Sequence, residues 1–228
     1  MKGKKEYLEL IDTLGDNHAG GSAETPLRAD AHVLSDEEKI KIIQTHFSKV
    51  LETLGLDLTD DSLKGTSLRV AKMFVKEIFS GLNPMNEPIA SVFENKYGYN
   101  RMLVEKNISL YSTCEHHFLP IVGKAHVAYF PKNKVIGLSK LNRIVEYYAK
   151  RPQVQERLNV QIVNHLKKVL DTEDVACLID AKHLCVNSRG IKDVTSSTLT
   201  FEYSGKFQDP QLRKEFFETI KLDPYPED

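Results

Sequence analysis

Two short segments of this chain hold the residues most able to bind a metal ion. Cys114 and His117 are separated by two residues in Cys-Glu-His-His, close enough for both side chains to bind one ion through a turn. Further along, the sequence reads His-Leu-Cys at 183–185. Residues two apart in a strand point to the same face, so His183 and Cys185 are expected to project together. Side by side, the two segments would assemble two thiols and two or three imidazoles.

Zinc accepts such a set, and the number of protein ligands decides what the site does. Four ligands close a structural site, whereas three leave a position for a reactive water, whose pKa the zinc lowers to about 7. With Cys114, His117 and Cys185 as ligands, His116 and His183 remain for proton transfer. A structural zinc, or two buried cysteines beside unrelated histidines, is the alternative that spacing leaves open.

Basic side chains near predicted element ends indicate an anion site. Ser139-Lys140 opens a predicted helix with Arg143 one turn later, and Arg189 follows the His-Leu-Cys segment. A helix N-terminus offers free N–H groups and partial positive charge, and arginine can bind phosphate oxygens through two hydrogen bonds. In a chain of net charge -1, several basic groups beside a metal motif favour a polyphosphate substrate over ordinary surface charge.

Two further helical patterns have a functional and an ordinary interpretation. The Glu156 carboxylate could accept hydrogen bonds from a guanine's N1–H and amine, a pairing that rejects analogues lacking those donors, yet the segment also reads as an ordinary helix surface. Arg69, Lys72 and Lys76 form one basic stripe along a helix. On spacing alone, a solvent-exposed face is the favoured reading of that stripe.

An α+β fold must position these residues. The predicted order is two helices, a ββααββ core and a last helix, which favours an antiparallel sheet covered on one face. A capping box at Ser35 and Glu38 starts the first helix, Ser139 caps the helix after the third strand, and Pro152 lies in the first turn of the next one. The predicted segments are helices at 35–54 and 66–81, strands at 102–112, 121–130, 135–136, 175–186 and 194–203, and a helix from 209.

The predicted organisation is a partly flexible arm over residues 1–33 and one catalytic domain over 34–228, made of a helical pair (34–100) and the ββααββ core (101–207). The 228 residues are 41% hydrophobic and 28% charged, as expected for a globular enzyme. No run approaches the roughly 18 apolar residues of a membrane span, and three cysteines fit a reducing compartment. We therefore expect a cytoplasmic protein with no nucleic-acid or membrane partner.

Four segments in this order, STCEHH, VIGLSKLNRIV, RPQVQERL and HLCVNSRG, closely resemble GTP cyclohydrolase I, the zinc enzyme that opens folate and pterin synthesis. The resemblance runs from about Thr25 to the terminal helix near Ile220. It implies a tunnelling fold whose sheets join in a ring. It also implies a toroidal homodecamer of two pentamers with active sites at subunit boundaries, and it leaves feedback regulation by a partner protein open.

The resemblance also assigns roles by motif position. GTP and water would give formate and 7,8-dihydroneopterin triphosphate. One Zn²⁺ per subunit would be held by Cys114, His117 and Cys185. His116 would protonate guanine N7, His183 would assist beside the metal, and Ser139 would relay protons in late steps. The guanine would be held by Glu156 with Gln155, and the triphosphate by Lys140, Arg143, Arg189, Arg69 and Lys72, some of them from a neighbouring subunit.

Two functions of other classes compete with this one. A related tunnelling-fold enzyme, the nitrile reductase of queuosine synthesis, uses a nucleophilic cysteine with NADPH and no zinc. The His116-His117 pair and the His183-x-Cys185 segment argue against it. A non-catalytic paralogue should have lost a metal ligand or the proton donor, and here all are present.

Overall fold

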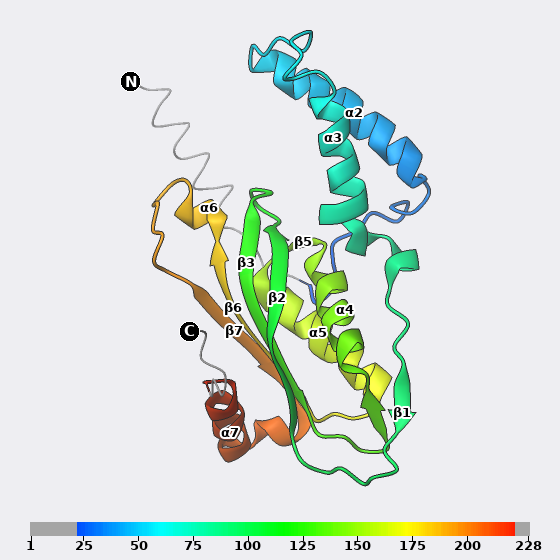
Figure 1. The fold of residues 1–228 in the computed structure, drawn as a ribbon, viewed down its shortest axis with the longest axis vertical. Helices are drawn as coiled ribbons and strands as arrows, with labels where there is room; N and C mark the ends of the chain where they lie inside the picture. Colours follow the sequence, from blue (N-terminus) through cyan, green and yellow to red (C-terminus); the bar gives the residue numbers. More distant parts are fainter. Residues whose placement is uncertain (1–21, 222–228) are drawn as a thin grey trace.

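The computed structural model describes residues 22–221 as an α+β fold, with a helical pair that projects beyond one end of a curled sheet (Figure 1). Residues 22–35 lead without regular structure into α2 (Asp36–Thr53). The predicted capping box is confirmed: the Glu38 N–H donates to Ser35 Oγ at 3.3 Å, and the Ser35 N–H donates to Glu38 Oε2 at 2.8 Å. The part of the predicted arm over 1–21 lies outside the described residues.

The second predicted helix is α-helical only in its first half. α3 (Thr66–Met73) continues into a π-helical turn, η1 (Phe74–Ile78), and two 3₁₀ turns, η2 (Ser80–Leu82) and η3 (Pro84–Asn86). Gly81 fixes the end of this segment, because its N–H donates to the Lys150 carbonyl at 2.9 Å and a Cβ there would lie 2.0 Å from the Tyr147 carbonyl oxygen. The helix end is thus held against the end of another helix, and one α-helix over 66–81 was a wrong prediction.

The main sheet has the strand order β5-β2-β3-β6-β7. Its long strands are β2 (Leu103–Cys114), β3 (Pro120–Tyr129), β6 (Val175–His183) and β7 (Thr198–Tyr203), and they pair antiparallel as predicted. The two-residue strand β5 (Pro152–Gln153) pairs parallel to the end of β2, so the sheet is mixed. The predicted third strand, β4 (Lys134–Ile136), instead pairs with β1 (Val92–Glu94) in a separate two-stranded ribbon.

Three predicted boundaries of helices or strands that carry candidate site residues are wrong. α4 (Leu138–Ala149) is capped by Gly137, whose carbonyl accepts from the Lys140 N–H at 2.8 Å, so Ser139 lies inside the first turn. α5 (Gln155–Leu170) starts after Val154, because Pro152 is held extended in β5. The strand predicted over 175–186 ends at His183, which pairs with Ile121 near the start of its partner strand β3. The short helix α6 (Leu184–Asn187) follows.

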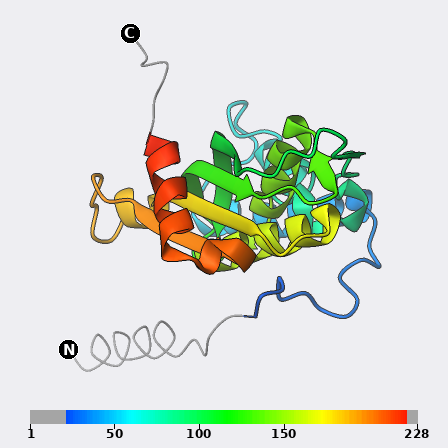
Figure 2. The same cartoon turned by 90° about the horizontal axis from the view of Figure 1, so that it is seen from below.

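The sheet is covered on both faces, although one face was predicted. α4 and α5 pack their apolar sides on one face, over residues such as Leu110, Val127 and Ile179. η4 (Gly205–Gln208) and α7 (Pro210–Lys221) cover part of the other face, where Phe207 and Phe216 meet the opposite-facing strand residues (Figure 2). Within the described residues, no helix is long and apolar enough to cross a membrane.

Candidate active site

The ends of three strands bring the predicted metal ligands together. Cys114 is the last residue of β2, and the turn that follows carries Glu115, His116 and His117 before β3 begins. The turn is closed by hydrogen bonds from the Cys114 N–H to the Leu119 carbonyl and from the Phe118 N–H to the Cys114 carbonyl, both 2.9 Å. β6 runs beside β3 and delivers α6, with Cys185, to the same end of the sheet.

The donor atoms of Cys114, His117 and Cys185 all lie within 4.8 Å of one another. Two sulfurs and one imidazole nitrogen fit zinc, and three protein ligands leave a coordination position for water. Cys185 reaches this cluster from a helical turn, so the reason given for it from strand alternation was wrong although the cluster itself is confirmed.

The cluster is electrostatically prepared for a cation. Burial raises the pKa of the Cys114 thiol, but hydrogen bonds from His183, His117 and the backbone N–H groups of residues 116 and 117 outweigh it and bring the pKa to about 5. Burial and the neighbouring Cys114 sulfur raise the pKa of the Cys185 thiol, while the Arg189 charge opposes this. This low pKa favours the thiolate form of Cys114 at neutral pH.

Two further histidines surround the cluster. The His116 Nδ1 lies 3.9 Å from Cys114 Sγ, and its side chain is 43% exposed. The His183 Nε2 makes a 2.8 Å hydrogen bond to the Gln155 Oε1. The Gln155 amide nitrogen donates to the carbonyls of Ile179 and Thr198, which fixes that amide in its orientation. The contacts of Gln155 thus orient His183, a role that the sequence did not suggest.

Glu156 and Arg189 lie at the same end of the sheet. Glu156 is exposed on the first turn of α5, directly after Gln155. Arg189 is exposed just beyond α6, and its charge acts on the Cys185 thiol. A carboxylate and a guanidinium therefore flank the metal cluster.

Ser139 and Lys140 lie at the opposite end of the sheet, and Arg143 lies near the middle of α4. The last residue of α4, Ala149, accepts a 2.8 Å hydrogen bond from Ser112, close to Cys114. The first turn of α4 lies by β4 and β1, beside the start of β2 (Figure 1). A helix of 12 residues is about 18 Å long. Within one chain, the predicted anion site at the start of α4 therefore does not lie beside the cluster of Cys114, His117 and Cys185.

The basic stripe on α3 is also set apart from the cluster. Arg69 donates to the Lys64 carbonyl and to Thr66, and Lys72 is exposed. Lys76, the third member of the stripe, is ion-paired with Asp36 at 2.8 Å. Residues 115–119, between β2 and β3, are called the metal loop here. The chain segment after α3 reaches this loop at Phe79, whose ring packs edge-on against Phe118 with the ring centroids 5.4 Å apart.

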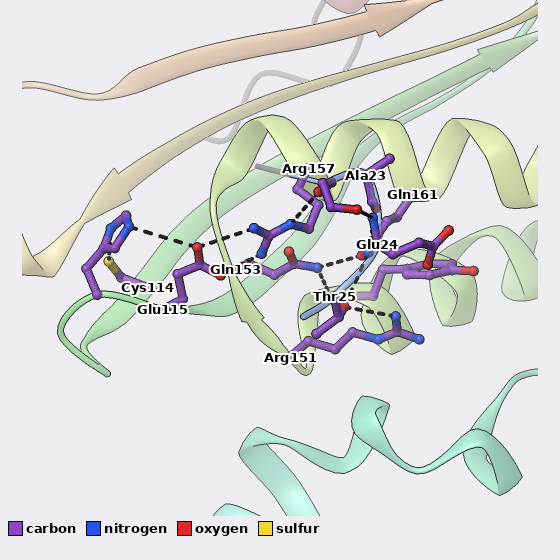
Figure 3. A network of polar contacts seen from close by, with 12 residues as sticks. Ala23, Glu24, Thr25, Cys114, Glu115, Arg151, Gln153, Arg157 and Gln161 are labelled. Carbon is purple, nitrogen blue, oxygen red and sulfur yellow. Dashed lines mark hydrogen bonds and ion pairs between the residues drawn. The ribbon is translucent and has the colours of Figure 1, made fainter. Parts of the chain in front are cut away.

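A buried ion pair beside the metal loop was not predicted. Arg157 and Glu115 lie within the QERL and CEHH motifs and pair at 2.5 Å, with the Arg157 side chain only 5% exposed. Figure 3 shows this pair joined to Gln153, Gln161 and residues 23–25. Arg157 and Glu115 both lie in motifs that the sequence singled out, but their spacing in the sequence does not indicate that the two side chains contact each other.

The curated relatives match this chain over nearly its whole length. The sequence profile of the GTP cyclohydrolase I family matches residues 43–221. The GTP cyclohydrolase 1 of Flavobacterium johnsoniae is 66% identical over 215 residues, which cover 94% of this chain and 96% of that protein. The GTP cyclohydrolase 1 of Citrobacter koseri is 50% identical over 199 residues, covering 87% and 90%. Among solved structures, the archaeosine synthase QueF-Like in the apo form matches 46% of this chain and 93% of its own, with 16% identity and a TM-score of 0.39.

Proposed function

The chain belongs to the GTP cyclohydrolase I family and has GTP cyclohydrolase I activity; from this premise we propose how its residues divide the reaction. The substrates are GTP and water, and the products are formate and 7,8-dihydroneopterin triphosphate, in the first step of tetrahydrofolate and pterin biosynthesis. The observation that carries the proposal is the cluster of Cys114, His117 and Cys185, whose donor atoms lie within 4.8 Å of one another.

We propose that these three residues hold one Zn²⁺ per subunit. The donor set fits the ion, and the Cys114 thiolate supplies negative charge for it. When bound, zinc acts as a Lewis acid that makes a nucleophile available from water at neutral pH.

The proton-transfer groups are the two histidines beside the cluster. His116 donates a proton to guanine N7, which makes C8 electrophilic, so that water adds there and the imidazole ring opens. His183, held by its 2.8 Å hydrogen bond to Gln155, moves protons during ring opening and the second hydrolysis that releases formate. Ser139 relays protons in the late rearrangement that closes the pterin ring.

The guanine edge is proposed to bind at the start of α5. The exposed Glu156 carboxylate accepts from the guanine N1–H and amine. Gln155 was expected to help hold the base through its side chain. Since its amide is bonded to His183, Ile179 and Thr198, its support for binding comes through the placement of Glu156 and His183.

The triphosphate requires a second subunit in this proposal. Arg189 lies by the metal cluster, but Ser139 and Lys140 lie in the first turn of α4, about 15 Å along the helix axis from its last residue, and Arg143 lies about 9 Å from that residue. We propose that a neighbouring subunit supplies those three residues, with Arg69 and Lys72. This arrangement fits a toroidal homodecamer with the tunnelling fold, in which residues 34–228 form one catalytic domain behind the arm.

One assay tests the reaction and the metal together. The purified protein is incubated with GTP, with and without a chelator, and formate is measured alongside the pterin chromophore after oxidation. We expect both products, their loss on chelation and their return with added zinc. Formate without pterin would mean an enzyme that stops after ring opening. Neither product from zinc-loaded protein would favour a non-catalytic paralogue, and NADPH consumption with a nitrile substrate would favour the reductase.

A further inference from the structure

A buried arginine makes a two-point contact with the loop that carries the metal ligands. Arg157 Nη1 donates to Glu115 Oε2 at 2.5 Å, and Nη2 donates to Oε1 at 3.3 Å. The Arg157 side chain is 5% exposed and that of Glu115 is 22% exposed. A two-point contact of this kind fixes both the position and the rotation of the carboxylate.

Glu115 stands between a metal ligand and the proposed proton donor. It follows Cys114 and precedes His116, and its Oε1 lies 3.9 Å from the His116 Nε2. Its backbone is fixed as well, because its N–H donates to the Gln153 carbonyl at 3.0 Å. With the carboxylate and the backbone both held, the loop has little freedom to carry His116 away from the substrate.

The remaining side of the guanidinium is covered by the chain before α2. Arg157 Nε donates to the Ser22 carbonyl at 3.0 Å. Residues 22–25, called the arm segment here, are held further by Gln161, which donates to the Ala23 carbonyl at 3.0 Å and to Thr25 Oγ1 at 3.3 Å. Arg151 also donates to Thr25 Oγ1, and Figure 3 shows these side chains converging on the arm segment.

Stability alone is a weak reason for such a pair. Removing two charges from water costs free energy, and a buried ion pair is often no more stable than a well-packed apolar pair of the same volume. What the ion pair adds is a fixed geometry for Glu115, and Glu115 is the residue next to His116. The position of the pair therefore points to catalysis.

We propose that Arg157 is a positioning residue for the proton donor: it fixes Glu115 against His116, and the arm segment closes over the guanidinium to keep that contact dry. The inference rests on the proposed role of His116 in ring opening. It adds to that role a set of contacts in which Arg157 on α5 and the arm segment hold Glu115, and Glu115 in turn contacts His116.

The test separates positioning from folding with three variants of the full-length, zinc-loaded enzyme. Arg157→Met leaves the Glu115 charge unpaired, Glu115→Gln leaves the Arg157 charge unpaired, and the double variant leaves neither. For Arg157→Met we expect a kcat for formate release lower by about 10²-fold, with KM and zinc content unchanged. In the double variant the melting temperature should recover towards wild type while kcat stays low.

Recovery of kcat together with the melting temperature would overturn the proposal, because the pair would then serve folding alone. Wild-type kcat in Arg157→Met would overturn it too. If Arg157→Met does not fold, Arg157→Lys keeps the charge but not the two-point contact, and a kcat lower by about tenfold is expected. His116→Ala is measured in parallel: if it still opens the ring, the donor assignment fails, whereas a dead His116→Ala beside an active Arg157→Met refutes only the positioning role.

The arm segment has its own matched pair of variants. Thr25→Val removes the hydroxyl that accepts from Gln161 and Arg151 at unchanged volume, and should lower kcat about fivefold at constant KM. Thr45→Val is the control, since Thr45 is exposed on α2 and its hydroxyl donates to the Lys41 carbonyl one turn earlier. Equal kcat values for the two variants would refute the contribution of the arm segment.

Discussion

Two inactive variants should restore each other's activity if the active site is shared between subunits. Cys185→Ser removes a sulfur donor from the metal cluster and leaves the start of α4 intact. Lys140→Ala removes a proposed triphosphate contact and leaves the metal cluster intact. Because the two residues lie at opposite ends of the sheet, each variant retains one complete half of the site.

The expected recovery follows from counting the halves. Each site combines the metal cluster of one subunit with the α4 residues of its neighbour. In an equal mixture that assembles at random, the metal cluster of a site is intact with a probability of about 0.5, and the neighbouring α4 residues are intact with the same probability. About one quarter of the sites are then complete in a head-to-tail assembly. The mixture should show about a quarter of wild-type formate release, although each parent alone shows almost none.

Co-expression with two different affinity tags, followed by tandem purification and the formate assay, measures this recovery. Lys214→Ala is a suitable control partner for Cys185→Ser, because Lys214 is exposed on α7 and forms an exposed ion pair with Glu218 at 3.8 Å. That mixture should reach about half of wild type, since only the metal half is diluted. A Cys185→Ser and Lys140→Ala mixture that stays at the level of its parents would refute the shared site.

Three further predictions concern the metal and the guanine. Cys185→Ser should lose zinc by elemental analysis, whereas His116→Ala should keep zinc and GTP binding but release no formate; zinc loss in His116→Ala would reverse the two assignments. Glu156→Gln should weaken GTP binding about 10- to 100-fold, as expected for hydrogen bonds to a charged group, with zinc content unchanged, and unchanged GTP affinity by calorimetry would contradict its role. At pH 8, where imidazoles are generally neutral, zinc uptake should release about one proton, since the Cys114 pKa of about 5 makes it a thiolate already while the raised pKa of Cys185 keeps that thiol protonated. Zinc affinity should therefore rise about tenfold per pH unit below the Cys185 pKa, and a hundredfold rise would show that both thiols are protonated in the apo enzyme.

The sequence predicted the repeating structure better than its ends. Alternation of apolar residues located β2, β3 and β6, and the capping box located α2, because these signals come from neighbours in the chain. The ends of β6 and α5 depend on partners far away in sequence. His183 ends its strand opposite Ile121, close to where the partner strand β3 begins, and Pro152 is extended because β2 lies beside it.

The same distinction holds in the site. Cys114, His117 and Cys185 could be named from residue type, since a zinc site needs a small set of donors. The contacts of Gln155 with His183, and of Arg157 with Glu115, join residues 28 and 42 positions apart. Nothing in the spacing of QERL says which of its polar side chains turn inward and which, like Glu156, face the solvent.

The two open edges of the sheet bear on the ring proposed above. Because β5 covers only the last two residues of β2, the earlier part of β2 is one open edge of the sheet within the described residues, and β7 is the other. Both edges carry exposed apolar side chains, with Tyr111 on β2 and Leu199 and Phe201 on β7. Open edges of this kind invite pairing with another strand. A two-fold dimer would pair like edges and leave the other kind open, whereas joining β7 of one copy to β2 of the next uses both and closes when the rotation completes a circle. An assembly of that kind also sets unlike parts of adjacent subunits against each other, which is what a site divided between the two ends of one chain requires.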